Sequence, residues 1–201
     1  MATTSSASLA RLERLPATFL TRTAREIGMA PHDLYRLRDE GVVHELSRGV
    51  FRKAAAPEGQ VDLIAVALRA PLAVVCLETA LALHGLIDQI PAKVHIAVPR
   101  GTTPPRMDFP PLKVHRFNPD SFGIGVEMYE AAPSEWVRIY SAARSVVDAM
   151  RLRHLVGDVF ALRALRSSLE SVAARPGELV DLARTLGVGG SVLQAIEVVL
   201  S

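Results

Sequence analysis

Apolar side chains in the first 41 residues recur every three or four positions, which is typical of short amphipathic helices. Three helices are predicted: the first is capped by Ser6 or Ser8 and ended or interrupted by Pro16, the second runs from Thr21 to Gly28, and the third from Pro31 to Gly41. Thr21 is expected to be the N-cap of the second helix, because threonine is frequent at that position. In the third helix Leu34 and Leu37 are three positions apart and are expected to face inward.

Two short runs of β-branched and aromatic residues follow the third helix. Val42–Leu46 and Val50–Lys53 flank the segment Ser47–Gly49, and this pattern predicts a β-hairpin. Helix, short turn, helix and small hairpin is the element order of a winged helix-turn-helix. Residues 1–56 are therefore predicted to form a winged helix-turn-helix domain.

The pattern changes after residue 56, where small residues followed by Pro57 and Gly59 predict a linker. Strands are predicted near 72–76, 93–99, 112–117, 126–131 and 136–140, and helices near 61–69, 78–86, 142–153, 156–173, 176–186 and 190–200. Residues 57–201 are thus predicted to be an α+β domain with a small sheet and a C-terminal helical tail. The whole chain is expected to belong to the α+β class.

Composition supports a folded protein that is not embedded in a membrane. The chain has 201 residues, of which 49% are hydrophobic and 22% charged, so it can bury a sizeable core. No run approaches about 18 apolar residues and the N-terminus lacks a signal-peptide pattern, so a cytoplasmic protein without a membrane partner is expected. The single cysteine, Cys76, has apolar neighbours and is expected to be a buried small residue rather than a nucleophile.

Positive charge is concentrated at the N-terminal end of the chain. Residues 1–56 carry nine Lys or Arg and six Asp or Glu, a net charge of +3, whereas the remaining residues carry 14 against 15. This excess agrees with nucleic-acid binding but is too small to establish it.

Side chains on the predicted third helix and on the hairpin turn are candidates for contacts with DNA. Arginine pairs with guanine in bidentate fashion, and tyrosine and histidine reach phosphates or base edges. The start of a helix favours a phosphate, and the tip of a hairpin reaches the backbone or the minor groove. The candidates are Thr21, Arg22, His32, Tyr35, Arg36, Arg38 and Arg48. The alternatives are a solvated helix face, on which the arginines pair with Asp39 and Glu40, and a domain that binds another protein.

The second domain carries no strong catalytic motif. It has no glycine-rich phosphate loop, no HExxH and no CxxC, and its histidines lack metal-ligand spacing, so neither a cofactor nor a metal is expected. Arg144 and Asp148 are four positions apart on a predicted helix, which favours an ion pair, and Ser141 precedes them as a natural N-cap. A structural role and a binding or catalytic role both stay open for this segment.

Five blocks of the sequence, taken in order, resemble the AbiEi family of transcriptional regulators. They are Ser47–Phe51, Leu77–Leu86, Val94–Gly101, Val114–Arg116 and Ser141–Asp148, and they lie within residues 20–150. Three positions depart from the family pattern. Phe51 stands where Tyr is usual, Ala142 where Pro is common and Ser145 where Thr is common.

The resemblance implies an antitoxin of the abortive-infection type, with a winged helix followed by an α+β antitoxin domain. Such a protein represses its own operon by binding inverted repeats, and a homodimer on the DNA would match the symmetry of such repeats. It also neutralises a partner toxin of the nucleotidyltransferase fold. The antitoxin-domain candidates are Arg100, His115, Arg116, Arg144 and Asp148. Two alternatives stay open for that domain: a phosphotransferase that modifies the toxin, against which the missing phosphate loop argues, and a module that sequesters the toxin.

Overall fold

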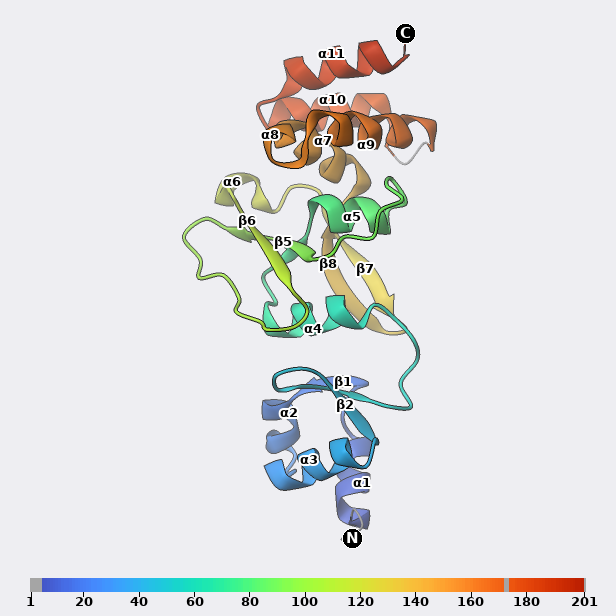
Figure 1. The fold of residues 1–201 in the computed structure, drawn as a ribbon. Coiled ribbons are helices and arrows are strands. Elements are labelled where there is room, and N and C mark those ends of the chain that lie inside the picture. The colour runs from blue at the N-terminus through green and yellow to red at the C-terminus, as the bar shows by residue number, and fades with distance from the viewer. Residues whose placement is uncertain (1–4, 172–173, 201) are drawn as a thin grey trace. The chain divides into compact units, whose positions relative to one another are not determined.

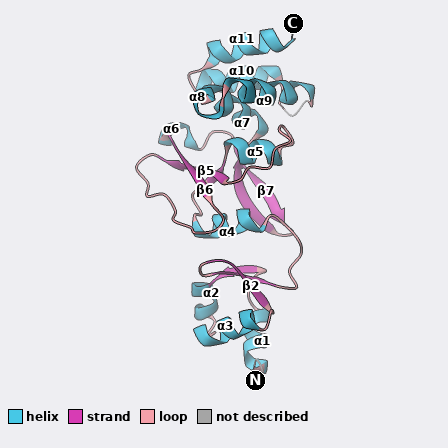
Figure 2. Ribbon diagram, in the orientation of Figure 1, coloured by secondary structure: helices cyan, strands magenta, loops and turns pink. Residues whose placement is uncertain are grey.

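The computed structural model describes residues 5–171 and 174–200. The chain is a mixed α/β protein, 47% helix and 20% strand, with two small sheets (Figures 1 and 2). The chain divides into two compact units. The N-terminal unit comprises the chain up to Leu72 with Pro105–Pro111 and Glu130–Val137, and the C-terminal unit comprises Ala73–Pro104, Leu112–Tyr129 and the chain from Arg138 onward. Within the described ranges no helix has both the length and the apolar character needed to cross a membrane.

The N-terminal unit combines four helices with a three-stranded antiparallel sheet. Its helices are α1 (Ser6–Glu13), α2 (Thr21–Glu26), α3 (Pro31–Asp39) and α4 (Val61–Arg69), and its strands β1 (Thr18–Leu20), β2 (Val43–Ser47) and β3 (Val50–Lys53) lie in the order β1-β3-β2. Helix α3 begins at Pro31, whose ring fixes a helical φ, and ends before Gly41, which has a φ of +73°. The three predicted helices and the hairpin are therefore present.

One apolar cluster forms the core beneath these elements. It consists of Leu12, Leu15, Phe19, Ala24, Met29, Leu34, Leu37, Val43 and Phe51. Leu34 and Leu37 are buried as their spacing predicts, and the rings of Phe19 and Phe51 stack at 6.2 Å between centroids. Strand β1, which brings Phe19 opposite Phe51, was not predicted.

Two predicted helix caps are wrong. The N-cap of α1 is Ser5, whose hydroxyl accepts a hydrogen bond from the Ser8 N–H at 3.2 Å. The N-cap of α2 is Leu20 rather than Thr21. Thr21 is used differently, because its N–H and its hydroxyl both donate to the carbonyl of Gly49, at 3.0 and 3.3 Å.

A buried arginine joins distant segments of the N-terminal unit. Arg52 on β3 is 5% exposed and its guanidinium donates to the Thr18 hydroxyl, the Pro57 carbonyl and the Glu135 carboxylate. Glu135 belongs to the segment Glu130–Val137, which clusters with this unit although it lies far along the chain. Arg52 therefore holds a late segment of the sequence against the first sheet.

The second sheet has five strands in the order β6-β5-β4-β8-β7. They are β4 (Val74–Val75), β5 (Val94–Pro99), β6 (Leu112–Phe117), β7 (Val126–Ala132) and β8 (Glu135–Tyr140), with the short helices α5 (Leu77–Leu83) and α6 (Pro119–Phe122) between them. β5 pairs with β6 in parallel and with β4 in antiparallel register, and β4 pairs with β8 in parallel. All five strands agree with the predicted positions within two residues at each end, and of the two short helices between them α6 was missed.

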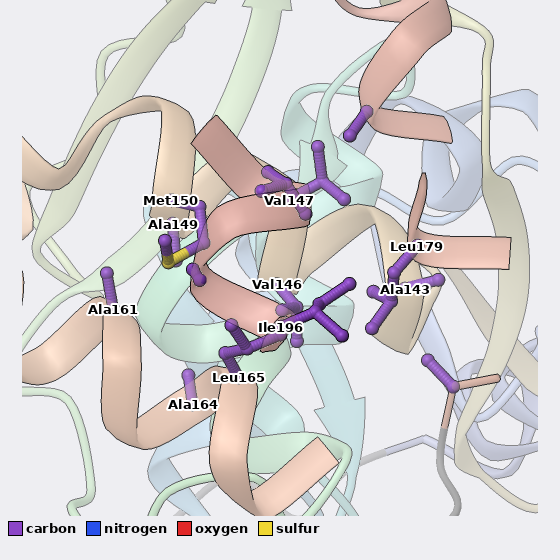
Figure 3. Packing of buried hydrophobic residues seen from close by; sticks show 14 of the residues in the cluster. Ala143, Val146, Val147, Ala149, Met150, Ala161, Ala164, Leu165, Leu179 and Ile196 are labelled. Atoms are coloured by element: carbon purple, nitrogen blue, oxygen red, sulfur yellow. The ribbon is translucent and has the colours of Figure 1, made fainter. Parts of the chain in front are cut away.

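The predicted helical tail is also present. It consists of α7 (Ala142–Arg151), α8 (Arg153–Val156), α9 (Asp158–Glu170), α10 (Pro176–Thr185) and α11 (Gly189–Leu200). Figure 3 shows Val146 and Met150 of α7 packed among Leu165 of α9, Leu179 of α10 and Ile196 of α11. The helix predicted over 156–173 begins instead at Asp158, because Gly157 with a φ of +95° separates it from the short helix α8, which was not predicted. The predicted end at 173 lies outside the described residues.

Candidate functional site

A depression of about 480 Å³ in the N-terminal unit brings together residues from four parts of its sequence. We call it the cationic notch, and it is lined by Leu20, Thr21, Arg22, Tyr35, Glu45, Arg48, Gly49, Leu68 and Arg69. These residues come from the start of α2, the middle of α3, the β2–β3 turn and the end of α4. Four of the seven predicted DNA-binding residues, Thr21, Arg22, Tyr35 and Arg48, therefore share one surface.

The β2–β3 turn is held in place by hydrogen bonds that set the position of Arg48. Gly49 accepts the two bonds from Thr21, and its own N–H donates to Glu45 Oε1 at 3.0 Å. Its φ is +75°, and a Cβ added there would lie 3.2 Å from the Thr21 hydroxyl, so glycine fits this turn best. The turn thereby fixes Arg48 next to the start of α2, where Arg22 lies.

Tyr35 packs on the core with one edge of its ring and is partly open to solvent. Its ring packs edge-on against buried Phe51, with 6.3 Å between centroids, while the residue remains 46% exposed. The guanidinium of Arg38 lies 5.0 Å from the centroid of the same ring. Tyr35 is consequently a partly rigid aromatic group facing the notch.

The arginines in and beside the notch fall into two classes. Arg22, Arg48 and Arg69 are exposed, and among the described residues none of them makes an ion pair or a side-chain hydrogen bond. By contrast, Arg36 bonds to Asp33 at 3.3 Å. Arg22, Arg48 and Arg69 all line the notch, so their charge there is not neutralised by ion pairs of their own. Arg14 and Arg25 are also exposed without an ion pair among the described residues, but they lie outside the notch.

Arg38 belongs to the paired class. It binds Asp39 at 2.9 Å and Glu45 at 3.2 Å, and these hydrogen bonds raise the pKa of Arg38 above its ordinary value. Among the residues that the structure describes, Glu45 is the one carboxylate that lines the notch, and both of its oxygens are engaged, one by Arg38 and one by the Gly49 N–H.

Three of the predicted DNA-binding residues do not line the notch. They are His32, Arg36 and Arg38, and each has a neighbouring carboxylate, that of His32 being Asp33 at 3.5 Å. Arg69 was not among the sequence candidates, because α4 follows the predicted domain boundary at residue 56. Its only signal in the sequence is a basic residue in the last turn of a helix.

In the C-terminal unit, the predicted pair Arg144 and Asp148 is present but fully buried. The side chains are 0% and 1% exposed, and Arg144 Nε donates to Asp148 Oδ2 at 2.8 Å. Arg144 Nη1 also donates to the carbonyls of Ser121 and Ile124, at 2.9 and 2.8 Å, and the guanidinium lies 4.6 Å from the centroid of the Tyr140 ring. These contacts tie α7 to the loop that follows α6.

Asp148 receives a second arginine. Arg151 donates to its other oxygen, Oδ1, at 2.7 Å. Burial raises the pKa of Asp148, and the two guanidinium groups oppose that rise. With both oxygens engaged inside the protein, Asp148 has the environment of a structural ion pair rather than that of an accessible acid or base.

His115 lies beside a second histidine that the sequence did not single out as a partner. The rings of His95 on β5 and His115 on β6 are 5.3 Å apart between centroids, and the residues are 3% and 9% exposed. Burial, together with Lys113 for His95 and with the neighbouring imidazole for His115, lowers the pKa of each to about 4. Both rings are therefore neutral at physiological pH.

The remaining antitoxin-domain candidates are dispersed. Arg100, directly after β5, and Arg116, on β6, are exposed. In the described part of the chain no side-chain hydrogen bond or ion pair joins either arginine to His115, Arg144 or Asp148. The five candidates thus do not form one catalytic constellation.

Cys76 and the metal-ligand residue types give no sign of a reactive centre. Cys76 is buried, as predicted, and burial raises the pKa of its thiol well above the ordinary value, which disfavours the thiolate. Across residues 5–171 and 174–200, no group of three or more His, Cys, Asp or Glu side chains is arranged to hold a metal ion.

Comparison of the chain with models of known protein families finds no match. Comparison with curated proteins finds no match either.

Proposed function

We propose that the N-terminal unit is a winged helix-turn-helix that binds double-stranded DNA, and that the protein is an antitoxin that represses its own operon. The observation that carries the DNA-binding proposal is the cationic notch. It gathers Arg22, Arg48 and Tyr35 from α2, the β2–β3 turn and α3, and neither arginine forms an ion pair among the described residues. Unpaired guanidinium groups on one surface are suited to phosphate oxygens.

The order and exposure of the elements support the same proposal. Helices α2 and α3 are joined by a four-residue turn and followed by the β2–β3 hairpin. Helix α3 buries Leu34 and Leu37 and leaves His32 and Tyr35 exposed on its other side. In the proposed complex α3 enters the major groove, and Arg48 at the hairpin turn contacts the backbone beside it.

The antitoxin proposal rests on the five sequence blocks that resemble the AbiEi family. Its partner would be a toxin of the nucleotidyltransferase fold. The burial of Arg144 and Asp148 favours neutralisation by direct binding over phosphotransfer, because neither side chain is accessible to a nucleotide. These residues would then stabilise the unit that binds the toxin, and exposed groups such as Arg100 and Arg116 would be available for contact.

DNA binding is tested with the full-length protein and two duplexes of equal length, one from upstream of its own gene and one of random sequence. The expected result is tighter binding to the upstream duplex and an affinity that falls with salt. Arg22→Ala and Arg48→Ala should weaken binding, whereas Arg166→Ala, which removes an exposed charge from α9, should not. Wild-type protein that binds neither duplex, or equal losses in all three variants, would refute the assignment.

The antitoxin proposal is tested by co-expression with the product of the adjacent gene, if that gene encodes a nucleotidyltransferase-like protein. Rescue of growth together with a stable co-purified complex is expected. Incubation of the two proteins with labelled nucleotide distinguishes the alternative mechanism. Label transferred to the toxin, with no stable complex, would favour the phosphotransferase instead.

A further inference from the structure

We infer that Arg69, on α4, is a phosphate contact and that the DNA-binding surface extends beyond residue 56 into this helix. The inference rests on the proposed DNA binding and assigns to it a residue that the sequence pattern places in another domain. Helix α4 belongs to the N-terminal unit, and its end supplies Leu68 and Arg69 to the lining of the cationic notch.

The packing of α4 explains why Arg69 faces the notch. The helix buries Leu63, Ile64 and Val66, which anchor it, and it contacts all three strands of the first sheet. Its last residue, Arg69, is exposed beyond this anchored segment. A cation at a helix C-terminus is also favourable to the helix dipole, so the position needs no acidic partner to be stable.

Charge at the notch favours an anionic ligand. Within the described part of the chain, the guanidinium groups of Arg22, Arg48 and Arg69 line it against the single carboxylate of Glu45, which is already engaged. Like charges gathered around one depression repel each other, and an anion placed among them relieves that repulsion. Double-stranded DNA presents one negative charge per roughly 1.7 Å of helix axis, so a backbone segment can supply such charge to all three arginines.

The location of Arg69 indicates backbone contact rather than base reading. It lies outside α3, the helix proposed to enter the groove, and it shares the notch with Arg48 of the hairpin turn. Contacts to phosphate fix the register of a protein on DNA without carrying sequence information. Arg69 should therefore contribute equally to specific and non-specific binding.

The test uses full-length protein carrying Arg69→Ala, Arg69→Lys or the matched control Arg166→Ala, which removes the same charge from an exposed position on α9. Binding to the upstream and random duplexes is measured over a range of salt concentrations. Arg69→Ala should weaken binding to both duplexes about tenfold at low salt and reduce the slope of log K against log salt by about 1. Arg69→Lys should restore most of the slope, and Arg166→Ala should match the wild type.

Three outcomes would overturn the inference. If Arg69→Ala binds like the wild type while Arg22→Ala and Arg48→Ala are weakened, Arg69 is not a contact and the proposed function stands. If Arg69→Ala weakens only the upstream duplex, the residue reads sequence rather than phosphate. If the wild-type protein binds no DNA, the proposed function and this inference fail together. Circular dichroism and the melting temperature of each variant separate loss of contact from loss of fold.

Discussion

The arginines that line the cationic notch and those that surround Asp148 lie in opposite environments. Arg22, Arg48 and Arg69 of the N-terminal unit are exposed and unpaired among the described residues. Arg144 of the C-terminal unit is fully buried and Arg151 partly so, and both bind Asp148. A buried charge needs a partner to be tolerated, whereas an exposed charge without one is free to meet a ligand. The contrast separates residues that hold the fold from residues that are available for function.

The strongest test of this contrast removes the shared carboxylate of the buried network. Asp148→Asn should lower the free energy of unfolding by about 3–5 kcal/mol, because it leaves Arg144 buried without a counter-charge. Urea denaturation measures the loss. The matched control is Asp181→Asn, which breaks the exposed pair with Arg184 and should cost less than about 1 kcal/mol. Equal losses in the two variants would remove the distinction between buried and exposed pairs.

The converse test removes two unpaired charges of the notch. The double variant Arg22→Ala/Arg48→Ala should bind the upstream duplex about a hundredfold more weakly, roughly 2.7 kcal/mol, while its stability changes by less than about 0.5 kcal/mol. Competition binding and urea denaturation measure the two effects. Arg163→Ala/Arg166→Ala removes the same net charge from exposed positions on α9 and should leave affinity unchanged. A large loss of stability in Arg22→Ala/Arg48→Ala would mean that these two arginines stabilise the fold, as Arg144 does.

A third test concerns buried groups that carry no charge. His95 and His115 are buried as neutral rings, so acid should destabilise the protein by favouring their charged forms. Their folded-state pKa of about 4 is below the ordinary 6.5. Between these values the unfolded chain binds protons that the folded protein does not, so stability should fall as the pH falls from 6.5 to 4.

Urea midpoints from pH 7.5 to 4.5 measure this dependence, and NMR titration follows the six histidines individually. His115→Gln should flatten the pH dependence, and His154→Gln, at an exposed position, should not. Six imidazoles that all titrate near pH 6.5 would contradict the prediction.

The smallest expected effect concerns a paired arginine within the N-terminal unit. Arg38 is engaged by Asp39 and Glu45, so Arg38→Ala should change DNA affinity by less than about threefold, compared with about tenfold for Arg48→Ala. Both variants are measured side by side at one salt concentration. A loss for Arg38→Ala as large as that for Arg48→Ala would mean that the ion pairs of Arg38 exchange for DNA.

Local patterns predicted most of the elements, and long-range contacts account for what they missed. The signals for α3 lie close together in the sequence, so that helix could be predicted. They are the buried Leu34 and Leu37 and the terminating Gly41. Strand β1 has only three residues and depends on β3, more than thirty positions away in the chain. Thr21 likewise looks like a helix cap locally, but Gly49 captures its polar groups in the folded chain.

The candidate site was predictable only in part for the same reason. Spacing predicted that Arg144 and Asp148 pair, and the 2.8 Å bond confirms it. Their complete burial depends on Ser121, Ile124 and Tyr140, which no local pattern connects to α7. Asp33 pairs with Arg36 three positions along the same helix, but the pairing of Arg38 with Glu45 depends on where β2 lies beside α3, so composition alone did not separate Arg38 from Arg48.

The bond between Arg52 and Glu135 bears on how a gene of this kind can recombine. A protein produced by a single crossover after residue 56 would keep the first sheet with Arg52 but would have a different segment in place of the one that carries Glu135. The acquired segment would have to provide an equivalent carboxylate, because Arg52 is buried and would otherwise keep its charge without one. When the N-terminal unit is exchanged between related proteins, we therefore expect Arg52 and Glu135 to be kept or replaced together, although they lie about eighty residues apart in the chain.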